Sequence, residues 1–145
     1  MTNKQLLQSI CTALMLTESD VNSLMGLAGL TAPAAASGLL DDCSNEQLRF
    51  LLEGLIIAER GPRDDGKAPA VETTALSNNE VLKKLRIAFN LQQDDMLLIF
   101  EEGGAELSRT EFGALFRKAD NKHFRACSDE LLLQFLSGFQ PKLDT

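Results

Sequence analysis

The stretch CSNEQLRFLLEGLII (residues 43–57) recurs later in the chain as CSDELLLQFLSGF (residues 127–139). Aligned, Cys43 matches Cys127 and Gly54 matches Gly138, with shared Ser, Glu and Leu positions between them. Each copy has a Ser at the start and apolar residues at helical spacing, which predicts a capped amphipathic helix. The repetition predicts a tandem duplication, with this helix as the central piece of each copy.

Earlier parts of the two copies also correspond. TNKQ (residues 2–5) and SNNE (residues 77–80) are both capping boxes followed by an apolar helical stripe. A second helix follows in each copy. A third begins at the capping box of Ser108, with a weak counterpart at residues 31–40. The offset between copies is 75 residues up to this point and 84 after it, because copy two has nine additional residues, 116–124.

These patterns predict an all-α protein of about eight helices, built from two four-helix repeats in a pseudo-twofold arrangement with a shared core. The predicted division is repeat 1 at residues 1–58, a linker at 59–75, and repeat 2 at 76–140. We expect the fourth helices, residues 44–58 and 128–139, to pack centrally, with residues 50–55 buried against 135–139. Gly54 and Gly138 are costly inside a helix, so each predicts a helix crossing too close for a Cβ.

Composition limits the possible partners and compartments. The net charge is −7, which disfavours generic binding to nucleic acid or to an anionic membrane. Three widely spaced cysteines without a CxxC pair argue against a disulfide framework and favour a reducing compartment. The first residues predict an amphipathic helix rather than a signal peptide, and the most apolar run, residues 48–58, is too short to span a bilayer. We therefore expect a cytoplasmic protein.

Several stretches resemble a family of uncharacterised bacterial proteins, the YehS-like family, which carries a tandem domain of unknown function. They are SNNEVLKKLRIAFNL (residues 77–91), SRTEFGALFRK (108–118), HFRACSDELLLQFLSGF (123–139) and FLLEGLIIAERG (50–61). These are packing and capping motifs, and the resemblance implies an all-helical cytoplasmic protein with no known activity. The family usually has a charged, aromatic-containing segment before the Cys in both copies. Copy one here lacks it, so a site in that segment would survive only in copy two.

Catalytic chemistry has two weak candidates. His123 is the single histidine and lies four residues from Cys127, which permits a nucleophile–base pair; without metal-ligand spacing, a solvated loop histidine is the simpler interpretation. Cys43 and Cys127 each precede a helix N-cap, where a thiol becomes reactive, but a buried apolar role at the helix entry is favoured. We expect no catalytic residue, no cofactor and no metal.

A nucleic-acid interface is the alternative. Residues 94–103 and 108–118 have a helix-turn-helix outline, in which Arg109, Arg117 and Lys118 would project from the third helix. Lys122 and Arg125 follow it, and the basic residues of 83–86 would lie nearby. The long turn and the acidic chain weigh against this. We therefore expect an interaction or regulatory module without catalytic activity, whose partner is a protein, self-association included, and not a membrane.

Overall fold

The computed structural model describes residues 1–30, 43–61 and 71–143, with side chains as far as Phe139. Within those residues it has seven α-helices and no strand, so the predicted all-α class is confirmed. The predicted eighth helix, at residues 31–40, lies outside the described residues. The helices are α1 (Asn3–Leu14), α2 (Glu18–Leu27), α3 (Asn45–Arg60), α4 (Asn78–Ala88), α5 (Gln93–Glu102), α6 (Arg109–Leu115) and α7 (Asp129–Leu143).

Most helices begin at a capping box. In each box a Ser or Thr side chain accepts a hydrogen bond from the amide three residues on, and the side chain of that residue accepts one from the cap amide. α7 also has a cap, because Ser128 Oγ accepts from the Leu131 amide at 3.1 Å. Replacing such a cap by Ala costs about 1 kcal/mol. The boxes begin at Thr2, Thr17, Ser44, Ser77 and Ser108.

Corresponding helices in the two halves end at residues with the same left-handed backbone conformation. Met15 after α1 and Asn90 after α4 both take the left-handed conformation, with φ of 59° and 51°. Gly29 after α2 and Gly104 after α5 have φ of 103° and 95°. The left-handed conformation lets the next amides return to open carbonyls of the last turn. Gly29 and Gly104 therefore end α2 and α5 at a conformation that suits glycine.

Two helix crossings are so close that backbones touch. A Cβ at Gly54 of α3 would overlap the backbone carbonyl of Leu24 in α2. A Cβ at Gly138 of α7 would overlap the backbone carbonyl of Ile99 in α5. Gly103, at the end of α5, makes the reciprocal approach to the backbone of α7. The predicted helix crossings at Gly54 and Gly138 are therefore confirmed.

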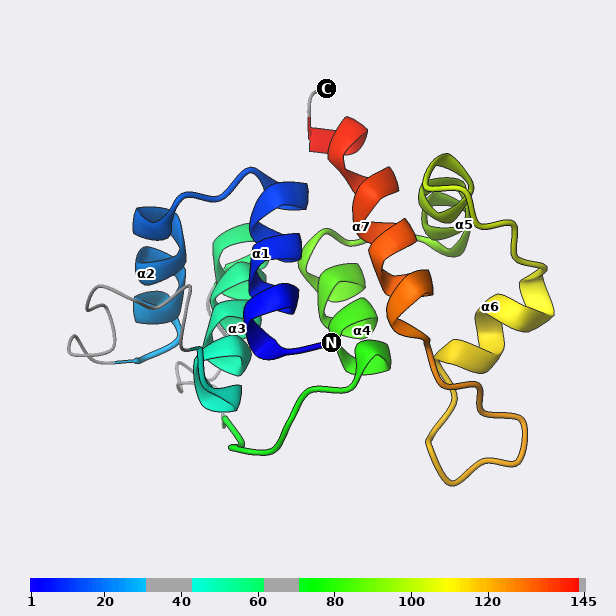
Figure 1. Cartoon of the computed structure of the whole chain (residues 1–145), viewed down its shortest axis with the longest axis horizontal. Helices are drawn as coiled ribbons and strands as arrows, with labels where there is room; N and C mark the ends of the chain where they lie inside the picture. Colours follow the sequence, from blue (N-terminus) through cyan, green and yellow to red (C-terminus); the bar gives the residue numbers. More distant parts are fainter. Residues whose placement is uncertain (31–42, 62–70, 144–145) are drawn as a thin grey trace.

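The first helix of each half packs on the far half. α1 packs mainly on α7, and α4 packs mainly on α3, whereas α2 packs on α3 and α5 packs on α7. Figure 1 shows the resulting row, with α2 near one end, α5 near the other, and α1 and α4 between them. One hydrophobic core continues through all seven described helices.

This arrangement corrects one prediction. α3 and α7 are not among the pairs of described helices that pack closely, so residues 50–55 are not buried against 135–139. The prediction was wrong because α1 and α4 are strongly amphipathic, and their apolar faces fill the space between the two longer helices. Leu7 of α1 and Leu82 of α4 are fully buried there.

The end of the predicted linker is anchored to α3. Glu59 and Arg60 still belong to α3, and the described residues 71–77 then run without helical structure to α4. Arg49, only 9% exposed, donates from Nε to the Thr74 carbonyl at 2.7 Å and from Nη2 to the Ala75 carbonyl at 3.1 Å. This stretch is therefore attached to the fold just before α4 begins.

Candidate functional site

A groove lies between α1 and α7. Its volume is about 670 Å³, and Met1 at the N-terminus is one of the residues that line it. Its apolar surface includes Leu133, whose exposed fraction of 41% is unusual for a leucine in an otherwise well-buried helix. A mixed lining of this kind, apolar with a few polar groups, is typical of a binding site. The lining residues are Met1, Gln5, Gln8, Ser9, Thr12 and Ala13 with Asp129, Leu133, Leu136 and Ser137.

One end of the groove contains an ion pair. The amino group of Met1 lies 2.7 Å from Asp129 Oδ2, and Asn78 Nδ2 donates to the other carboxylate oxygen at 2.8 Å. The hydrogen bond from the amino group and the one from Asn78 lower the pKa of Asp129 below its ordinary value. Apart from this pair, the side chains that line the groove are uncharged.

A smaller groove, of about 160 Å³, lies between α3 and α4. It is lined by ion pairs: Arg49 Nη1 lies 3.1 Å from Glu80 Oε2, and Lys84 Nζ is paired with Glu53. Burial alone would raise the pKa of Glu80, but hydrogen bonds from Arg49 and Ser77 outweigh it and lower the pKa. Residues 71, 72 and 76 form part of the wall.

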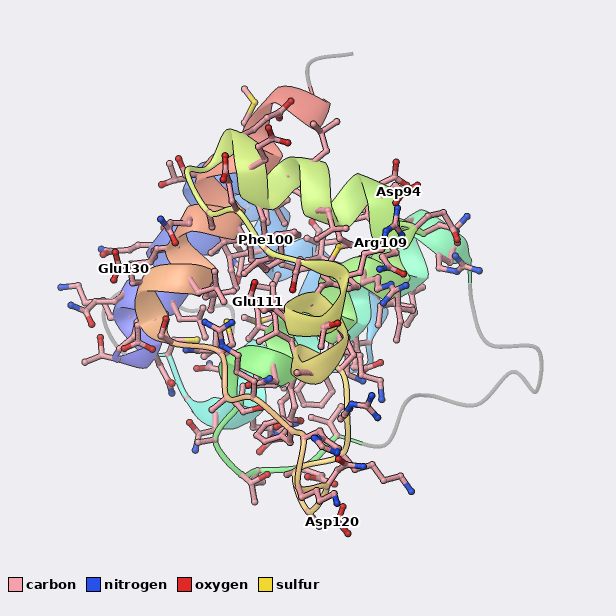
Figure 2. The ribbon with its side chains drawn as sticks, turned by 90° about the vertical axis from the view of Figure 1, so that its right-hand side faces the viewer. Asp94, Phe100, Arg109, Glu111, Asp120 and Glu130 are labelled. Carbon is pink, nitrogen blue, oxygen red and sulfur yellow. The ribbon has the colours of Figure 1, made fainter. Side chains whose placement is uncertain are left out.

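The five basic residues predicted for an anion site do not form one patch. Arg109 Nη2 is paired with Asp94 Oδ1 at 2.9 Å, and Arg125 Nη1 with Glu111 Oε2 at 3.3 Å. Figure 2 shows Arg109 beside Asp94, well away from Asp120 at the tip of the following loop. Two of the five cations are therefore paired with carboxylates, and Arg109 lies away from the tip of that loop.

The remaining three are Arg117, Lys118 and Lys122. α6 ends at Leu115, so the prediction that Arg117 and Lys118 project from this helix is wrong. Gly113 and Phe116 close the helix, and all three basic side chains stand exposed on the loop that follows. Residues 117 and 118 lie beyond the last residue of α6, so their side chains do not extend from this helix.

The basic residues of α4 have structural partners. Arg86 stacks over the rings of Phe112 and Phe116, with centroid distances of 5.4 and 5.0 Å, and Nε donates to the Leu91 carbonyl. These contacts fasten α6 to α4. Lys84 is paired with Glu53 across the smaller groove. Of the three, only Lys83 is exposed.

The cysteines occupy apolar positions. Cys43 and Cys127 are both buried, with Cys127 6% exposed. Burial raises the pKa of the Cys127 thiol to about 11, although the nearby charge of Arg125 opposes the shift. A thiol with that pKa is almost wholly protonated at neutral pH and is a poor nucleophile. His123 is exposed on the loop, so the two residues differ sharply in their access to solvent.

Sequence reasoning missed three features of these sites. The α1–α7 groove depends on which helices meet across the two halves, and a hydrophobic stripe does not specify its partner. Arg49 lies between apolar residues in α3, and a charge in that setting was a usable signal for a buried anchor. Asn79 was passed over as part of a cap, yet its side chain bonds the Leu115 and Arg125 carbonyls and the Cys127 amide, each at 2.9 Å.

Metal and membrane chemistry can be addressed for the described residues alone. Within residues 1–30, 43–61 and 71–143, no three His, Cys, Asp or Glu side chains are placed to hold a metal ion. In the same part of the chain, every helix is too short or too polar to cross a bilayer.

Fold and grooves together define a small all-helical protein with an open groove between its first and last helices. Residues 78–143 match a family described as a protein of unknown function (DUF1456). The chain is also 35% identical over 148 aligned residues to the uncharacterized protein YehS of Escherichia coli (strain K12), covering 95% of this chain and 94% of that protein. The chain therefore belongs to the YehS family. No solved structure matches it.

Proposed function

We propose that the chain arose by tandem duplication and that its two halves are related by a pseudo-twofold axis. Equivalent contacts at the 75- and 84-residue offsets support this. Asn3 Nδ2 donates to the Cys43 carbonyl at 3.0 Å, and Asn78 Nδ2 donates to the Cys127 carbonyl at 3.0 Å. The asparagine that begins α1 thus holds the residue before the N-cap of α3, and the asparagine that begins α4 holds the equivalent residue before α7.

The close crossings support the same relation. Gly54 meets the Leu24 carbonyl, and Gly138 meets the Ile99 carbonyl. Leu24 and Ile99 are 75 residues apart, and the two glycines are 84 apart. The reciprocal packing of α1 on α7 and α4 on α3 has the form that a twofold relation produces.

The function we propose is that of a cytoplasmic interaction or regulatory module that binds a partner protein and has no catalytic activity. The observation that carries it is the α1–α7 groove, which is lined by the exposed Leu133 and, apart from the paired Met1 and Asp129, by uncharged side chains. Apolar side chains in a groove are costly to leave in water, which favours their burial by a partner. The protonated thiol of Cys127 supports a role without nucleophilic chemistry.

Affinity capture from the native cell tests this function. The full chain and its Leu133→Glu variant are used as baits, with and without nuclease. We expect a protein partner that survives nuclease treatment and is lost with Leu133→Glu. Leu98→Glu is the matched control, because Leu98 is similarly exposed at 43% but lies on α5. Equal capture by all three baits, or capture that nuclease abolishes, would contradict the proposal.

Nucleic-acid binding through residues 94–118 and the loop after them is the alternative. The exposed Arg117, Lys118 and Lys122 favour it, whereas the net charge of −7 and the ion pairs of Arg109 and Arg125 oppose it. Binding of duplex DNA that weakens steeply with salt, and that disappears when the three loop cations are replaced by Ser, would establish this alternative instead.

A further inference from the structure

The two grooves occupy corresponding places in the two halves. At offsets of 75 and 84, residues that line the α1–α7 groove coincide with residues that line the α3–α4 groove. The correspondence covers both helices of each groove. The two grooves therefore lie at equivalent positions on the two helix pairs, and most of the matched side chains differ. The matched pairs are Met1 with Leu76, Gln5 with Glu80, Ser9 with Lys84, Leu133 with Arg49, Leu136 with Leu52, and Ser137 with Glu53.

Along the α3–α4 groove, the chain itself supplies one wall. Residues 71–77 run there without helical structure, and α3 binds them through their main chain. Asn45 Nδ2 donates to the Thr73 carbonyl at 3.3 Å, and Arg49 donates to the carbonyls of Thr74 and Ala75. Main-chain recognition of this kind gives affinity for an extended segment and leaves side-chain preference to the groove walls.

The α1–α7 groove differs from its counterpart in size and in charge. Its volume is about 670 Å³, against about 160 Å³ for the groove that residues 71–76 help to line. Leu133 stands where Arg49 stands in the other groove, and Ser137 stands where Glu53 does. The side chains of Gln8, Thr12 and Ser137 line it and donate no hydrogen bond within the described part of the chain. Each of these three side chains can therefore donate a hydrogen bond to a main-chain carbonyl of a bound peptide.

We propose that the α1–α7 groove binds an extended, uncharged peptide segment of a partner protein, at the position that corresponds to residues 71–77 beside the α3–α4 groove. This inference rests on the proposed interaction function and names its ligand. An apolar side chain of the peptide packs on Leu133 and Leu136, and its carbonyls accept from Gln8, Thr12 and Ser137. Apart from the paired Met1 amino group and Asp129 carboxylate, the described residues that line the groove are uncharged, which favours an uncharged segment.

The first test selects peptides on the full chain from a phage-displayed library of random 12-residue sequences. We expect enriched peptides with apolar residues and few acidic ones. A synthetic copy of one should bind the wild-type chain and lose at least about tenfold in affinity with Leu133→Glu, while Leu98→Glu leaves affinity unchanged. Failure to enrich any binder, or binding that Leu133→Glu does not weaken, would overturn the inference. So would a dimer of the chain that Leu133→Glu dissociates.

The second test tethers a copy of the segment that lines the α3–α4 groove beside the α1–α7 groove within one chain. The sequence VETTAL replaces Met1 ahead of Thr2, as it precedes Ser77 in the second half. Leu133→Arg and Gln5→Glu then install the counterparts of Arg49 and Glu80. We expect these two substitutions to raise Tm in the extended chain and not in the unextended one, because the tether supplies a high effective concentration. Equal Tm changes in both chains would show that the groove does not accept an extended segment.

The outcomes separate the ligand from the function. If affinity capture depends on Leu133 but no extended peptide binds, the interaction function stands and the proposed ligand is wrong. If neither capture nor peptide binding depends on Leu133, the proposed function of the groove and the proposed ligand are both wrong.

Discussion

The backbone carbonyl of Leu24 occupies the place where a Cβ on Gly54 would stand. Helices α2 and α3 therefore meet through main-chain atoms, and Ile99 and Gly138 repeat the contact between α5 and α7. Neither contact can be relieved by a side-chain rotation, since the obstructing atoms belong to the backbone. This explains why two helices tolerate a residue that weakens them.

Gly54→Leu and Gly138→Leu should each destabilise the fold by at least about 1–3 kcal/mol, because overpacking must push two helices apart. Even Gly54→Ala should be destabilising. Gly26→Ala is the matched control: it lies in α2, and a Cβ there meets nothing within 4 Å. That change should stabilise by up to about 1 kcal/mol through helix propensity. Urea unfolding measures all four; unchanged stability of both Leu variants would refute the crossings.

Arg49→Met should destabilise by about 2–4 kcal/mol, because it leaves the Thr74 and Ala75 carbonyls and the Glu80 carboxylate without their donor. Because Met preserves most of the buried volume, the loss of unfolding free energy measures the contribution of the hydrogen bonds that Arg49 makes. Arg109→Met is the control, since its pair with Asp94 is exposed and should contribute less than about 0.5 kcal/mol. Similar unfolding free energies for the two variants would mean that Arg49 is no anchor.

Stability should fall in acid in a way that depends on Glu80. Its pKa is lowered in the folded chain by Arg49 and Ser77, despite the opposing effect of burial. The ionised form therefore contributes stability above the unfolded pKa of about 4.3, and this contribution disappears as the pH falls through the folded pKa. Glu80→Gln should be less stable than the wild type at pH 7, with a difference that narrows toward pH 3. A constant difference across that range would contradict the assignment.

Asn79→Ala should loosen the loop between α6 and α7. Asn79 bonds the Leu115 and Arg125 carbonyls and the Cys127 amide, so its removal leaves three backbone groups without a partner and should cost about 1–3 kcal/mol. Trypsin should then cut faster after Arg117, Lys118 and Lys122. Asn121→Ala removes one hydrogen bond, from the His123 amide, and serves as the control. Equal cleavage rates in the two variants would exclude this role.

Local chemistry made much of the secondary structure predictable. Ser44, Ser77 and Ser108 define helix starts through contacts within four residues, and Gly29 and Gly104 define ends in the same way. The crossings at Gly54 and Gly138 followed from the cost of a mid-helix glycine. The end of α6 was missed because nothing in FRK distinguishes a last helical turn from the loop after it.

Long-range pairing was harder to predict. The stripes of α1 and α4 showed that each helix has a buried face, but Leu7 and Leu82 suit an apolar neighbour from either half equally well. Arg49 binds carbonyls 25 and 26 residues away, and a carbonyl has no signature in the sequence. Two residues of the predicted anion site have partners that were hidden for a related reason: Asp94 pairs with Arg109 and Glu111 with Arg125, from positions that spacing alone did not connect to them.

The exchange of first helices between halves has a consequence for synthesis in the cell. α1 emerges from the ribosome before every other described helix, yet its main packing partner is α7, which emerges after all of them. The nascent N-terminal segment must therefore keep its apolar side unpaired, or sheltered by a chaperone, until translation has nearly reached the end of α7. If translation stalled before α7, the apolar face of α1 would remain exposed and prone to aggregation.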